Sequence, residues 1–359
     1  MTTTWLRFGS AGFYAAAFLL LSGCVEATKD ETVSPHESEA ASKKKVASGP
    51  KILFITNSNG DWWNAVEKGM LDGGEKFGAQ VEMRRNEGTT EGQIQRLEEA
   101  LSLPDVKGVA VSVLEAESPG IADKMRELQK NGKVVIAIDS DGPADSRKAY
   151  IGTNNRTAGE VAGKVAATIR PQGGETAVFV GKPSAANAIE RRDGFFAGAG
   201  PAFKQVEIFN DDGDKNRAQS NVVTAISKYP NIGVMLGLWS YNPPRIAEEL
   251  AQTPALRKKV SVIAFDLDEL SVDHLEKGNI DVSICQNPYE MGYQGVRLLK
   301  AYIEDDKKTV EEMLPGGKTV IDTGVRIIVP TKDSPVKGDN VIDIKAMKEW
   351  LDSKGLKSS

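Results

Sequence analysis

Cysteine, histidine and long apolar segments are all scarce in this sequence. Its 359 residues include two cysteines and two histidines, and histidine is the side chain that most often performs acid–base catalysis near neutral pH. His36 falls in a polar segment near the N-terminus, and His274 falls in a predicted helix. These positions argue against a histidine-based catalytic pair and against a Cys/His metal site. We predict no cofactor and no bound metal ion.

An excess of basic residues is also absent. The chain has 45 Lys and Arg against 50 Asp and Glu, which gives a formal net charge of −5 at pH 7. Nucleic-acid-binding proteins instead carry a basic patch or stripe. No glycine-rich phosphate loop of the P-loop or dinucleotide type is present either. Nucleic acid is therefore not an expected partner.

The first 23 residues have the character of an export signal. The apolar run at residues 11–21 follows a single charged residue, Arg7, and it is shorter than the roughly 20 residues that a membrane-spanning helix needs. Its length suits the apolar region of a secretory signal. The run ends in LSGC, which resembles the bacterial lipoprotein box and implies cleavage before Cys24 and diacylation of Cys24. A short membrane helix and an ordinary secretory signal are the alternatives.

Residues 24–50 form the next segment, which begins at the cysteine. It has few large apolar residues and mixes charges of both signs, so it cannot bury enough surface to offset chain entropy. We interpret it as a disordered tether. If Cys24 carries lipid, Cys285 is unpaired and lies in an apolar run, where a free cysteine behaves as a small buried hydrophobe.

From residue 51 onward, β-branched apolar runs alternate with segments of helical periodicity. The runs are apolar on both faces, which is typical of interior parallel strands. They cover residues 51–56, 81–86, 108–113, 134–139, 176–181, 206–210, 233–238, 260–266 and 281–286. The alternation predicts βαβ units. About 310 residues exceed what one core usually holds, so the predicted fold is α/β with two doubly wound, Rossmann-like parallel-sheet lobes.

The end of the chain departs from this pattern. A helix is predicted to residue 303, followed by short strands at 319–322 and 325–329 and by a helix at 344–351. Helices are also predicted at 61–77 and at 154–169, the latter capped by Asn154 or Asn155.

Candidate binding residues stand where the predicted strands end, because doubly wound sheets bind ligands at the carboxyl ends of their strands. They combine amides, carboxylates, a guanidinium and indoles. Charged and amide groups pair with sugar hydroxyls, and indole rings pack on the apolar C–H faces of a sugar. The candidates are Asn59, Trp62, Trp63, Ser112, Asp139, Arg191, Trp239, Asp266 and Gln286.

Structural roles are the alternative for several of these residues. Trp63 falls on the apolar stripe of its helix and could serve packing, whereas Trp62 is one position off that stripe. Asp139 and Asp266 could cap the turns that follow their strands. The segment 211–214 (DDGD) lacks the later glutamate of a calcium loop and is predicted to be a turn.

Six segments together resemble the ribose-type periplasmic sugar-binding proteins. They are NSNGDWW, VIAIDSD, IGTNNRTAGEVAG, ERRDGF, VIAFD and SICQNPYEMG, and the likeness extends over residues 51–329. The resemblance implies the type I periplasmic binding protein fold, which is shared with the ligand domains of the lactose-repressor family. It also implies that ligand is bound by Trp62, Trp63, Asp139, Arg191, Asp266 and Gln286.

The same resemblance implies two lobes joined by a three-segment hinge. The N-terminal lobe would comprise residues 51–153 and 287–322, and the C-terminal lobe residues 154–286 and 323–355. The chain would cross between them near residues 151–154, 286–287 and 322–324.

Three positions depart from the ribose-type pattern. Asp139 is followed by Ser140 rather than by arginine, Ser112 stands near a typical asparagine, and Trp239 replaces a polar residue. The ligand need not be ribose, so other pentoses, hexoses, autoinducer-type furanoses and polyols remain open.

The resemblance implies a substrate-binding component of an ABC-type sugar uptake system, not an enzyme. It would be a monomer that is lipid-anchored in the periplasm or at the cell surface of a bacterium and delivers ligand to a membrane permease and its ATPase. One alternative is the ligand-binding protein of a sensor or chemoreceptor. Another is a carbohydrate-active hydrolase using Asp139 and Asp266 as a carboxylate pair. A transcriptional regulator of this fold would carry a helix-turn-helix where this chain has the export signal.

Overall fold

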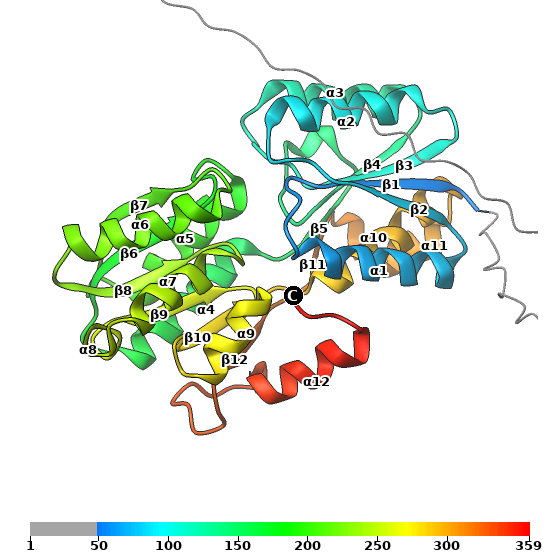
Figure 1. Ribbon diagram of the computed structural model, residues 1–359. Coiled ribbons are helices and arrows are strands. Elements are labelled where there is room, and N and C mark those ends of the chain that lie inside the picture. The colour runs from blue at the N-terminus through cyan, green and yellow to red at the C-terminus, as the bar shows by residue number, and fades with distance from the viewer. Residues whose placement is uncertain (1–48) are drawn as a thin grey trace, which may run out of the picture. The chain divides into compact units, whose positions relative to one another are not determined.

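The computed structural model describes residues 49–359, which belong to one compact unit (Figure 1). The predicted signal, Cys24 and nearly all of the tether lie outside the described residues. Within residues 49–359, no helix is both long and apolar enough to cross a membrane.

The first lobe is built on a six-stranded sheet with the order β11-β5-β4-β3-β1-β2. All its neighbouring strands are parallel. The strands are β1 (Lys51–Ile55), β2 (Gln80–Arg84), β3 (Val106–Val111), β4 (Val134–Ile138), β5 (Tyr150–Gly152) and β11 (Val320–Asp322).

Helices cover both faces of this sheet (Figure 1). One face packs against α1 (Trp63–Phe77), α10 (Pro288–Ile303) and α11 (Lys307–Met313), and the other against α2 (Thr90–Ser102) and α3 (Pro119–Lys130). Side chains alternate across a strand, so Ile52 and Phe54 of β1 enter one core cluster while Leu53 and Ile55 enter the other. This double burial explains why the strand is apolar at every position.

The second lobe is built on a seven-stranded sheet with the order β13-β12-β10-β9-β8-β6-β7. The strands are β6 (Gly174–Val180), β7 (Phe203–Asn210), β8 (Ile232–Gly237), β9 (Ser261–Phe265), β10 (Val282–Cys285), β12 (Arg326–Val329) and β13 (Val341–Asp343). One pair departs from the predicted parallel arrangement, since β10 and β12 are antiparallel. Strand β10 runs toward the other lobe, whereas β12 begins where the chain returns from it.

Helices also cover both faces of the second sheet. On one side lie α4 (Asn155–Ile169) and α5 (Ala186–Ala199). On the other lie α6 (Lys215–Lys228), α7 (Asn242–Ala251), α8 (Pro254–Arg257), α9 (Glu269–Glu276) and α12 (Ile344–Lys354). Asn154 caps α4 as predicted, because its side-chain oxygen accepts a hydrogen bond from Thr157 N at 3.0 Å. Sequence reasoning missed α11, which buries none of its residues, and the three-residue strand β13.

One helix pair in each lobe is packed so closely that glycine is required at the contact. A Cβ atom on Gly159 of α4 would lie 2.3 Å from the carbonyl oxygen of Arg191 in α5, and one on Gly69 of α1 would lie 1.9 Å from that of Tyr289 in α10. Such distances are far shorter than van der Waals contact. Six glycines share this feature: Gly69, Gly159, Gly163, Gly194, Gly198 and Gly292.

Three segments connect the lobes: residues 153–154, 286–287 and 323–325. Hydrogen bonds join the first connection to the third. Thr323 N donates to Gly152 O at 2.8 Å, and Asn154 N donates to the Asp322 carboxylate at 3.1 Å. These two connections therefore run side by side.

Candidate functional site

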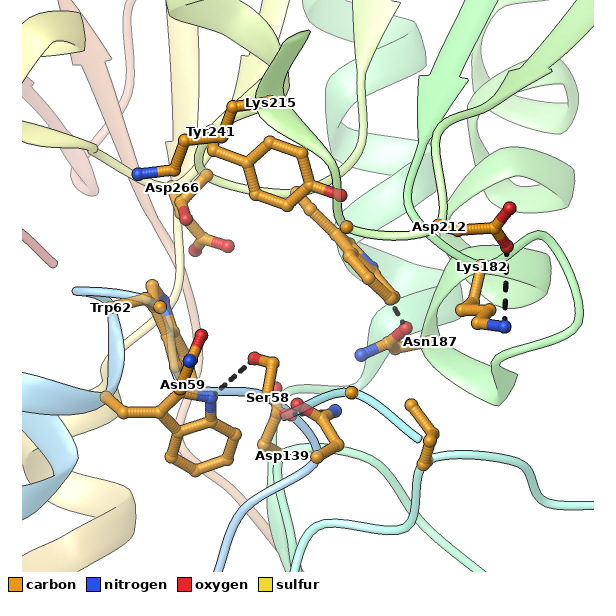
Figure 2. A pocket seen from close by; sticks show the side chains of 18 of the residues that line it. Ser58, Asn59, Trp62, Asp139, Lys182, Asn187, Asp212, Lys215, Tyr241 and Asp266 are labelled. Carbon is orange, nitrogen blue, oxygen red and sulfur yellow. Dashed lines mark hydrogen bonds and ion pairs between the residues drawn. The ribbon is translucent and has the colours of Figure 1, made fainter. Parts of the chain in front are cut away.

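The two sheets share one strand arrangement, and a cavity lies where their carboxyl ends meet. The order β5-β4-β3-β1-β2 of the first lobe is repeated as β10-β9-β8-β6-β7 in the second. The cavity has a volume of about 160 Å³ and is lined by residues that follow strands of both sheets. Figure 2 shows Ser58, Asn59, Trp62 and Asp139 on one side, facing Tyr241 and Asp266 on the other.

The structure brings eight of the nine predicted binding residues to this cavity: Asn59, Trp62, Trp63, Asp139, Arg191, Trp239, Asp266 and Gln286. Ser112 is the exception, because it lies behind the wall. Its side chain is fully buried, and its hydroxyl donates to Asp139 Oδ2 at 2.8 Å. Ser112 therefore orients a cavity residue and does not itself line the cavity.

Asp139 follows β4 in a left-handed backbone conformation with φ of 59°. Its carboxylate is buried and also lies 3.4 Å from Asn57 Nδ2. Burial raises the pKa of Asp139 to about 6, while Arg191 and the hydrogen bond from Ser112 oppose that rise. Tyr150 Oη donates to the Asp139 carbonyl at 2.8 Å and so fixes the turn from behind.

Asp266 follows β9 and is the counterpart of Asp139 in the second lobe. Its φ is 61°, and its carboxylate accepts hydrogen bonds from Gln286 N at 3.1 Å and Gln286 Nε2 at 3.0 Å. Burial raises the pKa of Asp266, whereas Arg191 and Gln286 lower it. Neither aspartate caps a helix through these contacts.

Arg191 is a buried cation in α5 with 1 % of its surface exposed. Its Nε donates to Asn155 Oδ1 at 2.9 Å, and its Nη1 donates to Leu238 O at 2.8 Å and lies 3.6 Å from Asp266 Oδ2. The guanidinium also lies 4.8 Å from the centre of the Phe265 ring. Buried charges persist when they are paired in this way.

Trp62 and Trp63 meet edge to face, with ring centres 5.0 Å apart. Trp63 serves both expected roles, since it belongs to a core cluster with Val66 and Met70 and also lines the cavity. Its Nε1 donates to Ser58 Oγ at 3.0 Å. Trp62 is 8 % exposed.

Trp239 and Tyr241 form the aromatic wall on the side of the second lobe. Trp239 Nε1 lies 3.3 Å from Asn187 Oδ1, and the two rings meet at 70° with centres 6.4 Å apart. Gly181 at the end of β6 makes room for them, because a Cβ there would lie 2.3 Å from the Trp239 ring and 2.5 Å from the Tyr241 hydroxyl.

Several further polar cavity residues were not among the predictions: Asn57, Ser58, Glu87, Lys182, Asn187, Asp212, Lys215 and Tyr241. Lys182 and Tyr241 follow β6 and β8 closely, which is where the strand-end rule places ligand-binding side chains. Asn187 is the second residue of α5 and carries no such signal. Asp212 lies in the predicted turn, and no cluster of potential metal ligands occurs in the described part of the chain.

Three buried polar atoms of cavity residues have no hydrogen-bond partner within residues 49–359. They are Trp62 Nε1, Arg191 Nη2 and Gln286 Oε1. The Trp62 indole N–H faces the Asp266 carboxylate closely enough to lower its pKa, but it does not complete a hydrogen bond of good geometry with it. Buried polar atoms are nearly always paired, so three unpaired ones in one cavity call for an explanation. Two of them are donors and one is an acceptor.

A fold of two similar lobes around such a cavity is that of a binding protein, and comparison with known families agrees. The chain matches the periplasmic binding protein domain over residues 52–308 and therefore belongs to this family. The predicted type I fold and the ribose-type resemblance are confirmed. The family is one of substrate-binding proteins.

Particular relatives include the D-allose-binding periplasmic protein of Escherichia coli K12. It is 25 % identical over 264 residues, which cover 69 % of this chain and 82 % of that protein. An ABC transporter solute-binding protein from Burkholderia graminis, solved with D-arabinose, is 28 % identical with a TM-score of 0.73, covering 81 % of this chain and 98 % of that chain. The glucose–galactose-binding protein GanP of Geobacillus stearothermophilus matches with a TM-score of 0.71 at 24 % identity, covering 80 % of this chain and 99 % of that chain. That likeness concerns the fold alone.

Proposed function

We propose that this protein binds a monosaccharide or a similar polyol in the cavity between its lobes. The observation that carries the proposal is the set of unpaired buried atoms on Trp62, Arg191 and Gln286. A sugar hydroxyl both donates and accepts hydrogen bonds, so one small polyol can satisfy all three. The indoles of Trp62 and Trp239 offer apolar surface to the C–H faces of the same molecule.

The size of the cavity supports a ligand with a single ring. A volume of about 160 Å³ is close to that of the engineered cavity of about 150 Å³ that binds benzene. Hydrogen bonds to charged groups contribute about 1.5–3 kcal/mol each. Four to six of them suffice for micromolar affinity, which corresponds to about −8 kcal/mol.

The proposal includes capture by lobe closure and delivery to an ABC-type uptake system. Both lobes contribute to the cavity wall, and hinged closure around a ligand is the usual behaviour of periplasmic binding proteins. The relatives of this chain include a D-allose-binding periplasmic protein and a solute-binding protein of an ABC transporter. We extend these roles to this chain, with a membrane permease and its ATPase as partners and with a lipid anchor at Cys24.

A sensory role is the second candidate. A solved relative, 25 % identical with a TM-score of 0.69, is described as the XylFII–LytSN complex, so a protein of this fold assembles with another protein there. The ligand chemistry would be the same in both roles.

Thermal unfolding of residues 46–359 with a panel of sugars tests the proposal. A chain starting at residue 46 retains the compact unit and its cores. The panel would contain D-allose, D-ribose, D-arabinose, D-xylose, D-glucose, D-galactose and their alditols. At a hundredfold over Kd, a ligand adds about 2.7 kcal/mol, which raises the melting temperature of a chain of this length by about 4 °C.

Adjacent arginines provide a matched control. Arg191→Ala should abolish the shift, because the cavity loses its buried cation. Arg192→Ala should preserve it, because Arg192 pairs with Asp193 and does not line the cavity. The proposal fails if no sugar or alditol raises the melting temperature of the folded protein.

A further inference from the structure

A buried carboxylate stands behind the aromatic wall of Trp239 and Tyr241. Asp211 follows β7, is fully buried and does not line the cavity. Both neighbouring segments do reach the cavity, through Asp212 on one side and through Tyr241 on the other. Its position is therefore one layer behind the wall.

Hydrogen bonds link Asp211 to both residues of the aromatic wall, Tyr241 and Trp239. Its Oδ1 accepts a hydrogen bond from Tyr241 Oη at 2.5 Å, and its Oδ2 accepts one from Asn242 Nδ2 at 2.8 Å. Asn242 in turn accepts the backbone N–H of Trp239 through its Oδ1 at 3.2 Å. One carboxylate thus fixes the Tyr241 ring directly and the Trp239 backbone through a single amide.

These contacts exceed what a local turn needs. The turn after β7 is closed by Gly213 N, which donates to Asp211 Oδ1 at 2.9 Å, and by Asp214 N, which donates to Asp211 O at 3.0 Å. The bonds to Tyr241 and Asn242 instead reach the loop after β8, 30 and 31 residues along the chain. They join two loops whose residues border the same cavity.

We propose that Asp211 is a positioning residue for specificity, which holds Trp239 and Tyr241 at the angle where their rings cover the apolar face of a cyclic sugar. The inference rests on the proposed function in its choice of ligand. Asp211 does not line the cavity, so it would affect binding only by holding Trp239 and Tyr241 in place.

The Asp211→Asn variant and its compensating partner test this role. Asparagine at position 211 turns an NH₂ group toward the NH₂ group of Asn242, so the link to Trp239 breaks. Adding Asn242→Asp restores a donor–acceptor pair, and the new carboxylate still accepts the Trp239 N–H. Asn242→Asp alone opposes two carboxylates.

The first readout needs no sugar. Indole N–H signals of Trp62, Trp63, Trp239 and Trp350 are recorded by ¹⁵N NMR on residues 46–359. Asp211→Asn should shift or broaden the Trp239 signal and leave that of Trp350 in α12 in place. The double variant should return the Trp239 signal toward its original position. An unchanged Trp239 signal in Asp211→Asn overturns the proposal.

The second readout is the Kd for D-arabinose, or for D-allose if that sugar gives the larger thermal shift. Asp211→Asn should weaken binding about tenfold, the effect of one lost hydrogen bond to a charged group, and the double variant should recover most of it. Recovery of the melting temperature without recovery of the Trp239 signal or of Kd would reduce Asp211 to a structural role.

Asp281→Asn is the matched control in the same lobe. Asp281 accepts a hydrogen bond from Val262 N at 2.7 Å and pairs with Arg257, away from the cavity. Its loss should lower stability and leave both readouts unchanged. If no sugar of the panel binds the unaltered protein, the proposed function fails, while the NMR comparison still decides the role of Asp211.

Discussion

Asp139 and Asp266 occupy the same place in two different sheets. Each follows the corresponding strand, β4 or β9, each is buried, and each adopts a left-handed conformation with φ near 60° (59° and 61°). Aspartate tolerates this conformation better than most residues. The repeated strand order therefore places one carboxylate from each lobe at a single cavity, where burial raises the pKa of both and the Arg191 cation opposes that rise.

The ionisation of Asp139 should make stability depend on pH. Its pKa is about 6 in the folded protein against 3.8 for the free group, so folding favours the protonated carboxyl. The resulting stability is present below about pH 4 and is lost as the pH rises through about 6. Asp139→Asn removes this dependence. As the pH rises over this range, the unaltered protein should therefore lose stability relative to the variant, by at most about 3 kcal/mol in the free energy of unfolding.

Urea unfolding at pH 4, 5, 6 and 7 measures this difference. Asp61→Asn, a change at an exposed position, is the control and should follow the unaltered protein at every pH. A difference for Asp139→Asn that stays constant between pH 4 and pH 7 would show that the buried carboxyl does not titrate there.

The indole N–H of Trp62 should contribute to ligand binding separately from its ring. Trp62→Phe keeps an aromatic surface and removes the unpaired donor, so Kd should rise by about fivefold to tenfold, or about 1 kcal/mol. Trp62→Ala removes the ring as well and should cost about 1 kcal/mol more. Titration calorimetry with the sugar that gives the largest thermal shift measures both.

Trp350→Phe is the control for Trp62, because Trp350 packs against Arg326 and does not line the cavity. It should leave Kd unchanged. Equal affinities for Trp62→Phe and the unaltered protein would mean that the N–H group finds no partner on the ligand.

Gly159→Ala should weaken ligand binding from a distance. The added methyl group would lie 2.3 Å from the carbonyl oxygen of Arg191, so α5 must move away from α4. We expect a loss of about 1–3 kcal/mol in stability together with a higher Kd, because the Arg191 side chain moves with its helix.

Gly120→Ala in α3 separates packing from helix propensity. Its methyl group would meet only the flexible end of Ile94, and alanine is a better helix former than glycine. This variant should be neutral or stabilising in urea unfolding. Comparable losses in both variants would remove the case for a close α4–α5 contact.

Cys24 should carry the lipid. Cys24→Ser removes the proposed lipid attachment site, so the protein should no longer incorporate labelled palmitate. Cys285→Ser should leave the labelling unchanged, because Cys285 is buried in the core. Palmitate labelling that persists in Cys24→Ser would contradict lipid attachment at this residue.

Much of the fold could be predicted because both sheets are buried on two faces. Strands such as β1 and β9 are apolar throughout, and their carboxyl ends mark the cavity. Side-chain direction beyond the end of a strand could not be predicted: past the end of β3, Leu114 lines the cavity, whereas Ser112 lies behind the wall and donates to Asp139. Trp63 could not be assigned to the core or to the cavity from the sequence, because at the start of α1 the core and the cavity wall share this side chain.

Long-range pairings could not be predicted at all. The antiparallel contact of β10 and β12 depends on where the returning chain enters the second lobe. The link from Asp211 to Tyr241 joins residues that no local pattern connects. Asn187 reached the cavity through the packing of α5, which its own neighbours in the sequence do not reveal.

The close helix pairs have a consequence for comparing distant members of the family. Side chains that face solvent can change freely, but a helix contact made by backbone atoms admits only the smallest residues. At identities of 20–28 %, few columns of an alignment are secure. The glycines of α1, α4, α5 and α10 are fixed by geometry rather than by ligand, so they offer landmarks for aligning chains whose binding residues have diverged.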